Sequence, residues 1–139
     1  MTDQPPPRPA RFEHHVRVAD VDIDELGHVN NVVYLQWVQD VAAAHWTHAA
    51  TDEQRATVVW VAVRHEIDYK APAFAGDQVL VRTWVEAWTA VTSDRHTEIV
   101  RASDGALLAK ARTVWAALDP ATKRPRRVGA DVIEGFLQP

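Results

Sequence analysis

Apolar and polar positions follow two different periods along this chain, and the longest apolar stretch has the period of a helix. Between Val32 and Trp46 the apolar surface is almost unbroken. The polar or small positions in and just after this stretch recur at i, i+3, i+4, i+7 and i+11, the spacing of one stripe along a helix. They are Gln36, Gln39, Asp40, Ala43 and Thr47. A helix that is apolar around most of its circumference is normally buried, so we predict a buried helix that begins near Asn30 and Asn31, both good N-cap types.

Five other stretches are predicted as strands, and the second of them is rich in β-branched and aromatic residues, as is typical of strands. They cover residues 12–18, 57–69, 78–88, 94–102 and 106–118. In the second of them, alternation places one set of side chains on a common face: Val59, Val61, Val63, His65, Ile67 and Tyr69. Short connections make the later strands antiparallel. The order of one strand, one long helix and four strands predicts an α+β fold in which one antiparallel sheet packs on one helix. A sheet edge or face left uncovered favours a dimer.

The chain length of 139 residues suits a single domain. Residues 1–10 hold four of the eight prolines, which favour extended and unpaired backbone, so we expect a Pro-rich disordered tail there. The folded domain is expected over residues 11–128, and residues 129–139 are expected to form a C-terminal tail. The first residues lack the apolar segment of a signal peptide, and we therefore expect a cytoplasmic protein.

Charge and composition exclude several classes of function. A net charge of −4 argues against general nucleic-acid binding. No apolar run approaches the roughly 20 residues of a membrane span, so no membrane association is expected. The chain has no cysteine and hence no disulfide or thiolate ligand, and its seven histidines do not form a recognised metal motif. GxGxxG, Walker A and GxSxG motifs are also missing from the sequence, so dinucleotide binding, phosphoryl transfer and serine hydrolysis have no support.

An acidic turn directly before the predicted helix carries the candidate chemistry. Asp24 lies close to the amide groups at the helix start, which have no intrahelical partner. It is a candidate nucleophile or general base, or alternatively a turn or capping residue. Asp22 is either a turn former or an electrostatic neighbour of Asp24. His28 is a candidate acid, base or ligand-orienting group, or else a packing residue. Gly27 permits a positive φ or a close approach of substrate.

Asn30 is a candidate hydrogen-bond partner for a carbonyl group, or a helix cap. A group of apolar residues on the helix and the second strand suggests an acyl pocket or, equally, plain core: Tyr34, Trp37, Val59, Trp60 and Val61. The basic residues of 122–127 form either a solvated tail or a contact for the phosphates of a cofactor.

Two motifs together resemble a known family. The run D-x-D-x-x-G-H-V-N-N-x-x-Y-L at residues 22–35 and the run I-x-Y-K-x-P-A-x-x-G-D at residues 67–77 are similar to hotdog-fold acyl-CoA thioesterases of the 4-hydroxybenzoyl-CoA thioesterase type. The closing D-P-x-T-x-R/K-P turn is similar as well, and the resemblance covers about residues 12–128. The Gly-His-Val-Asn-Asn segment resembles a branch whose members act on varied acyl groups, which leaves the acyl group open.

The resemblance implies a hotdog fold, with a curved five-stranded antiparallel sheet wrapped around the long helix. It also implies a homodimer, or a dimer of dimers, with active sites at the interface. The catalytic carboxylate of the family falls on Asp24, and its oxyanion donor falls on the backbone amide of Asn31. His28 is expected to assist catalysis. The remaining candidates are expected to bind or shape an acyl-CoA substrate: Asp22, Gly27, Asn30 and Tyr34. No metal and no cofactor is expected, because coenzyme A is part of the substrate.

Two other functions stay open at this stage. A hotdog hydratase or dehydratase uses Asp and His in D-x-N-P-x-H, whereas Asp24 and His28 are four residues apart and the Asn-Pro pair is missing. A non-catalytic acyl-CoA binder on the same fold is the alternative from another class.

Overall fold

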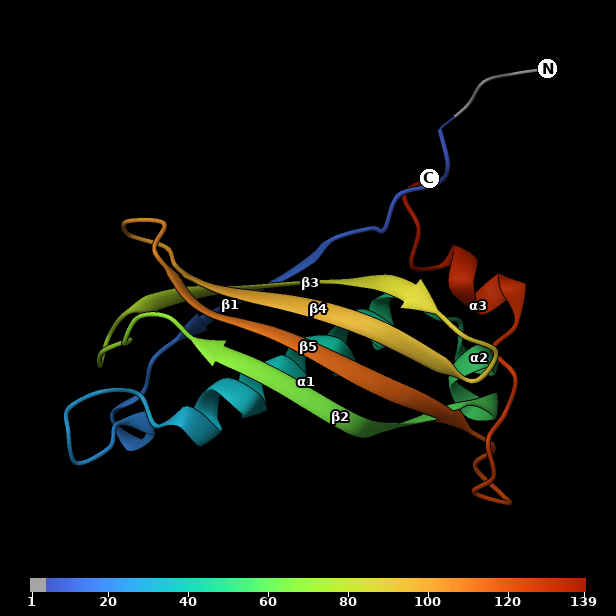
Figure 1. The fold of residues 1–139 in the computed structure, drawn as a ribbon, viewed down its shortest axis with the longest axis horizontal. Coiled ribbons are helices and arrows are strands. Elements are labelled where there is room, and N and C mark those ends of the chain that lie inside the picture. The colour runs from blue at the N-terminus through green and yellow to red at the C-terminus, as the bar shows by residue number, and fades with distance from the viewer. Residues whose placement is uncertain (1–4) are drawn as a thin grey trace.

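The structure is a computed structural model that describes residues 5–139 (Figure 1). Its elements are β1 (Phe12–Arg17), a 3-10 turn η1 (Asp20–Asp22), α1 (Asn31–Ala49), α2 (Asp52–Thr57), β2 (Val59–Tyr69), β3 (Gln78–Trp88), β4 (Thr92–Arg101), β5 (Leu107–Leu118) and α3 (Ala130–Glu134). The five strands form one sheet in the order β1-β3-β4-β5-β2, and every neighbouring pair is antiparallel. The predicted α+β arrangement is confirmed. Both β1 and β2 are edge strands.

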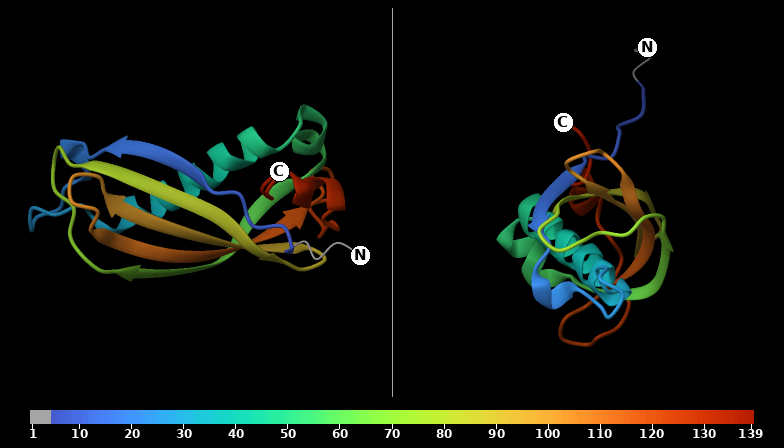
Figure 2. Two further views of the ribbon diagram at one scale, coloured as in Figure 1. Left: turned by 90° about the horizontal axis from the view of Figure 1, so that it is seen from above. Right: turned by 90° about the vertical axis from the view of Figure 1, so that its left-hand side faces the viewer.

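Helix α1 packs on one face of the sheet, which curls around it (Figure 2). Its buried side is formed by large and small apolar residues together with one histidine: Tyr34, Trp37, Val38, Val41, Ala42 and His45. The first half of α1 packs against a core that includes Val81, Ile99 and Leu108. The predicted outer stripe is exposed at Gln36 and Asp40, whose side chains hydrogen-bond to each other at 2.8 Å. The helix therefore lies between its sheet and a polar outer surface.

The polar stretch after α1 forms a second, short helix. The side chain of Thr51 accepts from the amide of Gln54 at 3.1 Å, and the side chain of Gln54 accepts from the amide of Thr51 at 2.9 Å. This reciprocal capping box stabilises the start of α2.

A bulge in β2 changes which residues face the helix. The register against β5 shifts between Ala62 and Arg64, so that Val63 is an extra residue. Because one extra residue inverts the alternation, the predicted single face from Val59 to Tyr69 is wrong. Val61 and Val63 are 45% and 59% exposed, and Trp60 packs inward against Trp46 instead.

Residues 8–10 pack against residues 136–138, two short segments that the sequence assigned to the N-terminal and C-terminal tails. The Ala10 amide donates to the carbonyl of Phe136, and the Gln138 amide donates to the carbonyl of Arg8, both at 2.8 Å. Val132 and Phe136 are buried at the far end of the sheet. The ordered fold therefore extends from Arg8 to Gln138, while residues 1–4 lie outside the described part of the chain.

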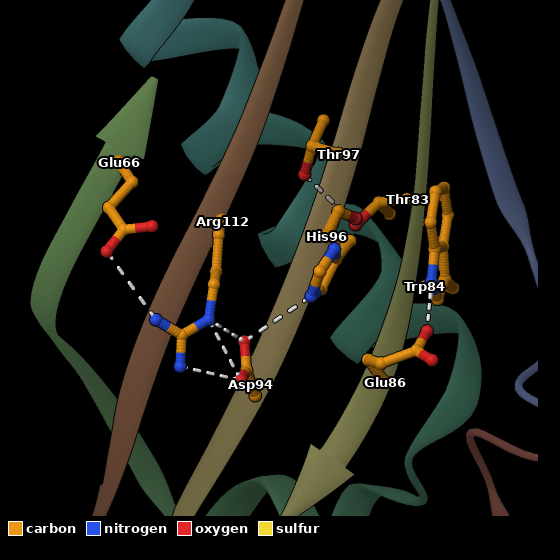
Figure 3. A network of polar contacts seen from close by, with 8 residues as sticks. All are labelled: Glu66, Thr83, Trp84, Glu86, Asp94, His96, Thr97 and Arg112. Carbon is orange, nitrogen blue, oxygen red and sulfur yellow. Dashed lines mark hydrogen bonds and ion pairs between the residues drawn. The ribbon is translucent and has the colours of Figure 1, made fainter. Parts of the chain in front are cut away.

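The sheet face that points away from α1 carries a polar network across three strands (Figure 3). Arg112 on β5 binds both carboxylate oxygens of Asp94 on β4 at 2.7–2.9 Å. It also lies 3.6 Å from Glu66 on β2, and His96 lies 3.7 Å from Asp94. On the opposite face, Thr97 on β4 bonds to Thr83 on the neighbouring strand β3 at 3.2 Å. Polar residues on both faces thus fix the register of the central strands.

Candidate active site

The loop between η1 and α1 is held in a compact form by its own backbone. The Asp24 amide donates to the carbonyl of His28 at 2.7 Å, and the Gly27 amide donates to the carbonyl of Asp24 at 3.1 Å. Gly27 has a φ of 81°, a conformation that residues with a Cβ rarely adopt. The predicted need for a positive φ at Gly27 is therefore confirmed. The tight turn brings the Asp24 carboxylate back toward the start of α1.

The Asp24 carboxylate is fixed through one oxygen. Its Oδ1 accepts from the amides of Leu26 at 2.8 Å and His28 at 3.2 Å. Among the described residues, no hydrogen bond or ion pair involves Oδ2. Hydrogen bonds to one oxygen orient a carboxylate, so the second oxygen is presented in a fixed direction with its lone pairs available.

The start of α1 places a free amide beside this carboxylate. Asn30 is the N-cap: its Oδ1 accepts from the amide of Val32 at 3.1 Å, and its carbonyl accepts from the amide of Val33 at 2.9 Å. The Asn31 amide has no partner within residues 5–139. Unpaired amides at a helix N-terminus carry partial positive charge and bind anions. Asn31 therefore offers a donor to a developing negative charge.

Asp24 and Asn31 open into one hollow of about 430 Å³. Its walls come from the loop before α1, from the first turn of α1 and from the end of β2 with the segment that follows. The lining residues are Asp24, Leu26, His28, Val29, Asn30, Asn31, Tyr34, Tyr69, Lys70, Ala71 and Pro72. Five of the predicted site residues are thus brought together: Asp24, His28, Asn30, Asn31 and Tyr34.

Two predicted substrate-binding residues do not line this hollow. Asp22 turns its Oδ2 toward the amide of Ala19 at 3.0 Å, and its carbonyl accepts from the amide of Asn30 at 2.8 Å. It therefore holds the 3-10 turn and the helix start. Gly27 contributes the conformation of the loop and no wall. In the single chain, Asp22 positions Asn30, and Gly27 positions the loop that carries Asp24. Both residues therefore affect the site indirectly.

His28 lies in the hollow and is linked to Asp24 through its backbone only. Its ring packs edge-on against Phe74 at 5.6 Å between centroids. Within the described residues, no hydrogen bond joins the His28 ring to the Asp24 carboxylate. The acid and base pair that a hydratase would need is therefore not formed in this chain.

Tyr34 and Tyr69 form the inner wall. Tyr34 is 2% exposed, its hydroxyl accepts from the amide of Ala73 at 3.1 Å, and burial raises the pKa of its phenol. Tyr69 donates to the carbonyl of Asn31 at 3.2 Å and packs against the Tyr34 ring at 5.5 Å. Tyr69 has no separate signal in the sequence beyond its place in the second family motif. The pair holds the first turn of α1 against the end of β2.

Metal binding and membrane crossing can each be considered for the described part of the chain. Within residues 5–139, no three His, Asp or Glu side chains are grouped as metal ligands. The described helices include none that is long and apolar enough to cross a membrane.

Comparison with solved structures agrees with this architecture. A 1,4-dihydroxy-2-naphthoyl-CoA thioesterase from Synechocystis superposes with a TM-score of 0.80 at 21% identity, covering 91% of this chain and 96% of the other. A thioesterase from Thermus thermophilus, crystallised with coenzyme A and Zn, superposes with a TM-score of 0.78 at 25% identity, covering 89% of this chain and 90% of the other. A DHNA-CoA thioesterase from Staphylococcus aureus gives a TM-score of 0.79 at 19% identity, covering 91% of this chain and 88% of the other.

Sequence comparison defines the family. No curated protein sequence matches the chain. The model of the thioesterase-like superfamily matches residues 16–136, nearly the whole folded region and both motifs. The predicted hotdog fold and the predicted thioester hydrolase are thereby confirmed, and the match reaches into the segment beyond residue 128. The chain belongs to the thioesterase-like superfamily.

Proposed function

We propose that this protein hydrolyses acyl-CoA thioesters, with Asp24 as the catalytic carboxylate and the Asn31 amide as the oxyanion donor. The observation that carries the proposal is the pairing of these two groups in one hollow. A carboxylate with one fixed and one free oxygen lies beside a helix amide that has no partner among the described residues. The first group activates or performs an attack on a carbonyl carbon, and the second stabilises the oxyanion that results.

In the reaction, the thioester carbonyl oxygen accepts from the Asn31 amide at the positive end of α1. Asp24 removes a proton from a water molecule as the water oxygen bonds to the carbonyl carbon. The tetrahedral intermediate then collapses, the carbon–sulfur bond breaks, and the departing thiolate takes the proton. In the alternative route, the Asp24 oxygen attacks first and water hydrolyses the resulting anhydride. Loss of one oxyanion donor typically raises such a barrier by about 2.7–4 kcal/mol.

The other residues of the hollow shape this site. Gly27 gives the loop its turn, and Asn30 caps the helix so that the Asn31 amide remains directed at the substrate. His28, whose ring packs against Phe74, forms a side wall, and Tyr34 forms part of the inner wall. The thioesterase from Thermus thermophilus was crystallised with coenzyme A, which supports coenzyme A as the leaving group here. No metal ion takes part in the proposed steps.

We also propose a homodimer that forms along β2. This strand is a sheet edge, and it exposes Val61 and Val63 next to its unpaired backbone. An antiparallel pairing of two β2 strands would continue the sheet into a second copy. It would also bring the far end of the partner, with its basic turn at 122–127, toward the Asp24 hollow. In one chain these two regions lie at opposite ends of the molecule (Figure 1). Phosphates of coenzyme A would then meet basic residues of the second copy.

Thiol release from a panel of short, long and aromatic acyl-CoAs tests the proposed activity. We expect turnover of at least one class, and the preferred class identifies the acyl group. Saturable binding of an acyl-CoA to the folded protein without thiol release would contradict hydrolysis and support the non-catalytic binder.

A further inference from the structure

A second cavity lies at the other end of α1 and shares no wall with the Asp24 hollow. It has a volume of about 360 Å³ and lies between the second half of α1, strands β2 to β5 and the segment after α3. Five of its thirteen lining residues are aromatic: Trp46, Trp60, Trp88, Trp115 and Phe136. Ala42, which lies on its helix side, is eleven residues from Asn31, or about 16 Å along the helix axis.

Arg95 lines this cavity and has no acidic partner among the described residues. It is only 4% exposed. Its Nη1 contacts His45 Nδ1 at 2.9 Å and donates to Thr83 Oγ1 at 3.1 Å, and both of these partners are uncharged. No carboxylate of residues 5–139 lies within ion-pair distance of it, unlike the outer-face Arg112. Burial lowers the pKa of Arg95 to about 9, so the guanidinium keeps its charge at neutral pH. An unpaired buried charge is costly.

Two residues that line the cavity carry buried donor atoms without a partner among the described residues, and neighbouring side chains close both atoms off from the cavity itself. Arg95 Nε and Trp115 Nε1 are the two buried side-chain polar atoms that have no hydrogen-bond partner among the described residues. Both residues line the same cavity. Native interiors leave few such groups without a partner, and each one calls for a specific explanation. Here a buried guanidinium without an anionic partner lies at an aromatic wall, with its Cζ atom 5.7 Å from the centroid of the Phe136 ring.

We propose that this cavity binds an organic acid with an apolar body, whose carboxylate pairs with the Arg95 guanidinium. The carboxylate supplies the missing countercharge, because a guanidinium group only donates hydrogen bonds. The indole rings and Phe136 enclose the apolar body. The volume is within the range of small-molecule sites. This site goes beyond the proposed hydrolysis, because it does not involve Asp24 or Asn31.

The test compares 4-phenylbutanoate with its uncharged amide, 4-phenylbutanamide, by titration calorimetry on the Asp24→Asn protein. Because that variant needs no turnover, failure of this proposal is separable from failure of the proposed reaction. We expect the acid to bind at least about tenfold more tightly than the amide, as loss of a hydrogen bond to a charged group implies. Equal binding of acid and amide, or no binding of the acid, would overturn the proposal.

Two variants test which arginine binds the carboxylate of the added acid. Arg95→Met is expected to lose at least about tenfold in affinity for the acid and little for the amide. Arg55→Gln is the matched control, since Arg55 lines the same cavity but is already paired with Asp52 and with the carbonyls of Thr47 and Ala50. It should keep the acid affinity. A larger loss in Arg55→Gln than in Arg95→Met would contradict the assignment. If Arg95→Met does not fold, Arg95→Gln removes the charge but keeps a polar side chain beside His45 and Thr83, and the same loss of acid affinity is expected.

The same carboxylate chemistry is offered by a free acid and by the far end of a dicarboxylic acyl group. Inhibition of thiol release by 4-phenylbutanoate distinguishes these sources in the unsubstituted protein. Competitive inhibition indicates that the cavity continues the acyl site, whereas non-competitive inhibition indicates a separate effector site. No inhibition at concentrations that saturate binding would restrict the ligand to free acids without effect on turnover.

Discussion

Individual residues at the two ends of α1 differ in how their polar groups are satisfied. At the N-terminal end, the Asp24 carboxylate is fixed by two amides, while the Asn31 amide finds no partner within residues 5–139. At the C-terminal end, His45 and Arg95 are buried among aromatic rings. Burial, and secondarily the charge of Arg95, lowers the pKa of His45 to about 3. His45 is therefore neutral in the folded protein and accepts from the guanidinium.

The low pKa of His45 predicts a loss of stability in mild acid. Between about pH 6.5 and pH 3 the unfolded chain protonates this residue while the folded chain does not, so the unfolded state binds more protons. The free energy of unfolding should then fall as the pH falls, by up to about 1.4 kcal/mol per pH unit from this group. Urea unfolding between pH 7 and pH 5 measures the slope.

Two substitutions assign that slope to His45. We expect His45→Gln to flatten the pH dependence, because glutamine cannot take up the proton. His14→Gln changes an exposed histidine on β1 and should leave the slope as it is. The same slope in both variants would contradict the role of His45.

At the scale of the elements, the sequence predicted those parts that depend on local pattern. The helix start at Asn30 and all five strands followed from spacing and residue type, and the structure contains each of them. The bulge at Val63 could not be predicted, because it depends on the register against β5. Arg95 was missed for another reason: an arginine in a polar stretch is usually exposed, and nothing local indicates that its strand faces a cavity.

The segment after residue 128 was also misjudged, because its apolar residues are too few to show a period. In the structure, Phe136 is 2% exposed and packs against His45, Trp46 and Trp88. It covers the open end of the sheet. The fold therefore needs this segment to close its second core and to complete the aromatic cavity.

We expect Phe136→Ala to lower the free energy of unfolding by about 3–5 kcal/mol, as is typical for a buried phenylalanine. Phe74→Ala removes a phenylalanine that is 43% exposed and should cost much less. Denaturant unfolding of both variants gives the comparison. Similar small losses in the two proteins would show that residues 129–139 behave as the tail that the sequence suggested.

At the scale of the whole molecule, β2 is an edge strand whose free side has no neighbouring strand within residues 5–139 of the single chain. The strand combines an unpaired edge with exposed valines, and the Asp24 hollow opens beside its end. A second copy paired along β2 would cover both. The hotdog resemblance implied such an assembly from the sequence, while the bulge explains how Val61 and Val63 become available for it.

Charge placed on this edge should separate the proposed dimer. We expect the double variant Val61→Lys, Val63→Lys to sediment as a monomer at concentrations at which the unsubstituted protein is a dimer. Thiol release should fall with dissociation if the second copy completes the site. Val21→Lys, at a valine that is 89% exposed on η1, is the control and should remain dimeric. A dimeric double variant would place the interface elsewhere.

The most direct measurement of the central claim is kcat/KM for thiol release by Asp24→Asn beside Asp22→Asn. Both variants exchange a carboxylate for its amide within the same turn, but only Asp24 faces the hollow. We expect Asp24→Asn to lose about 100-fold or more, equivalent to about 2.7 kcal/mol of transition-state stabilisation, and Asp22→Asn to lose only a few-fold. Full activity in Asp24→Asn, or an equal loss in both variants, would contradict the assignment of Asp24 as the catalytic carboxylate.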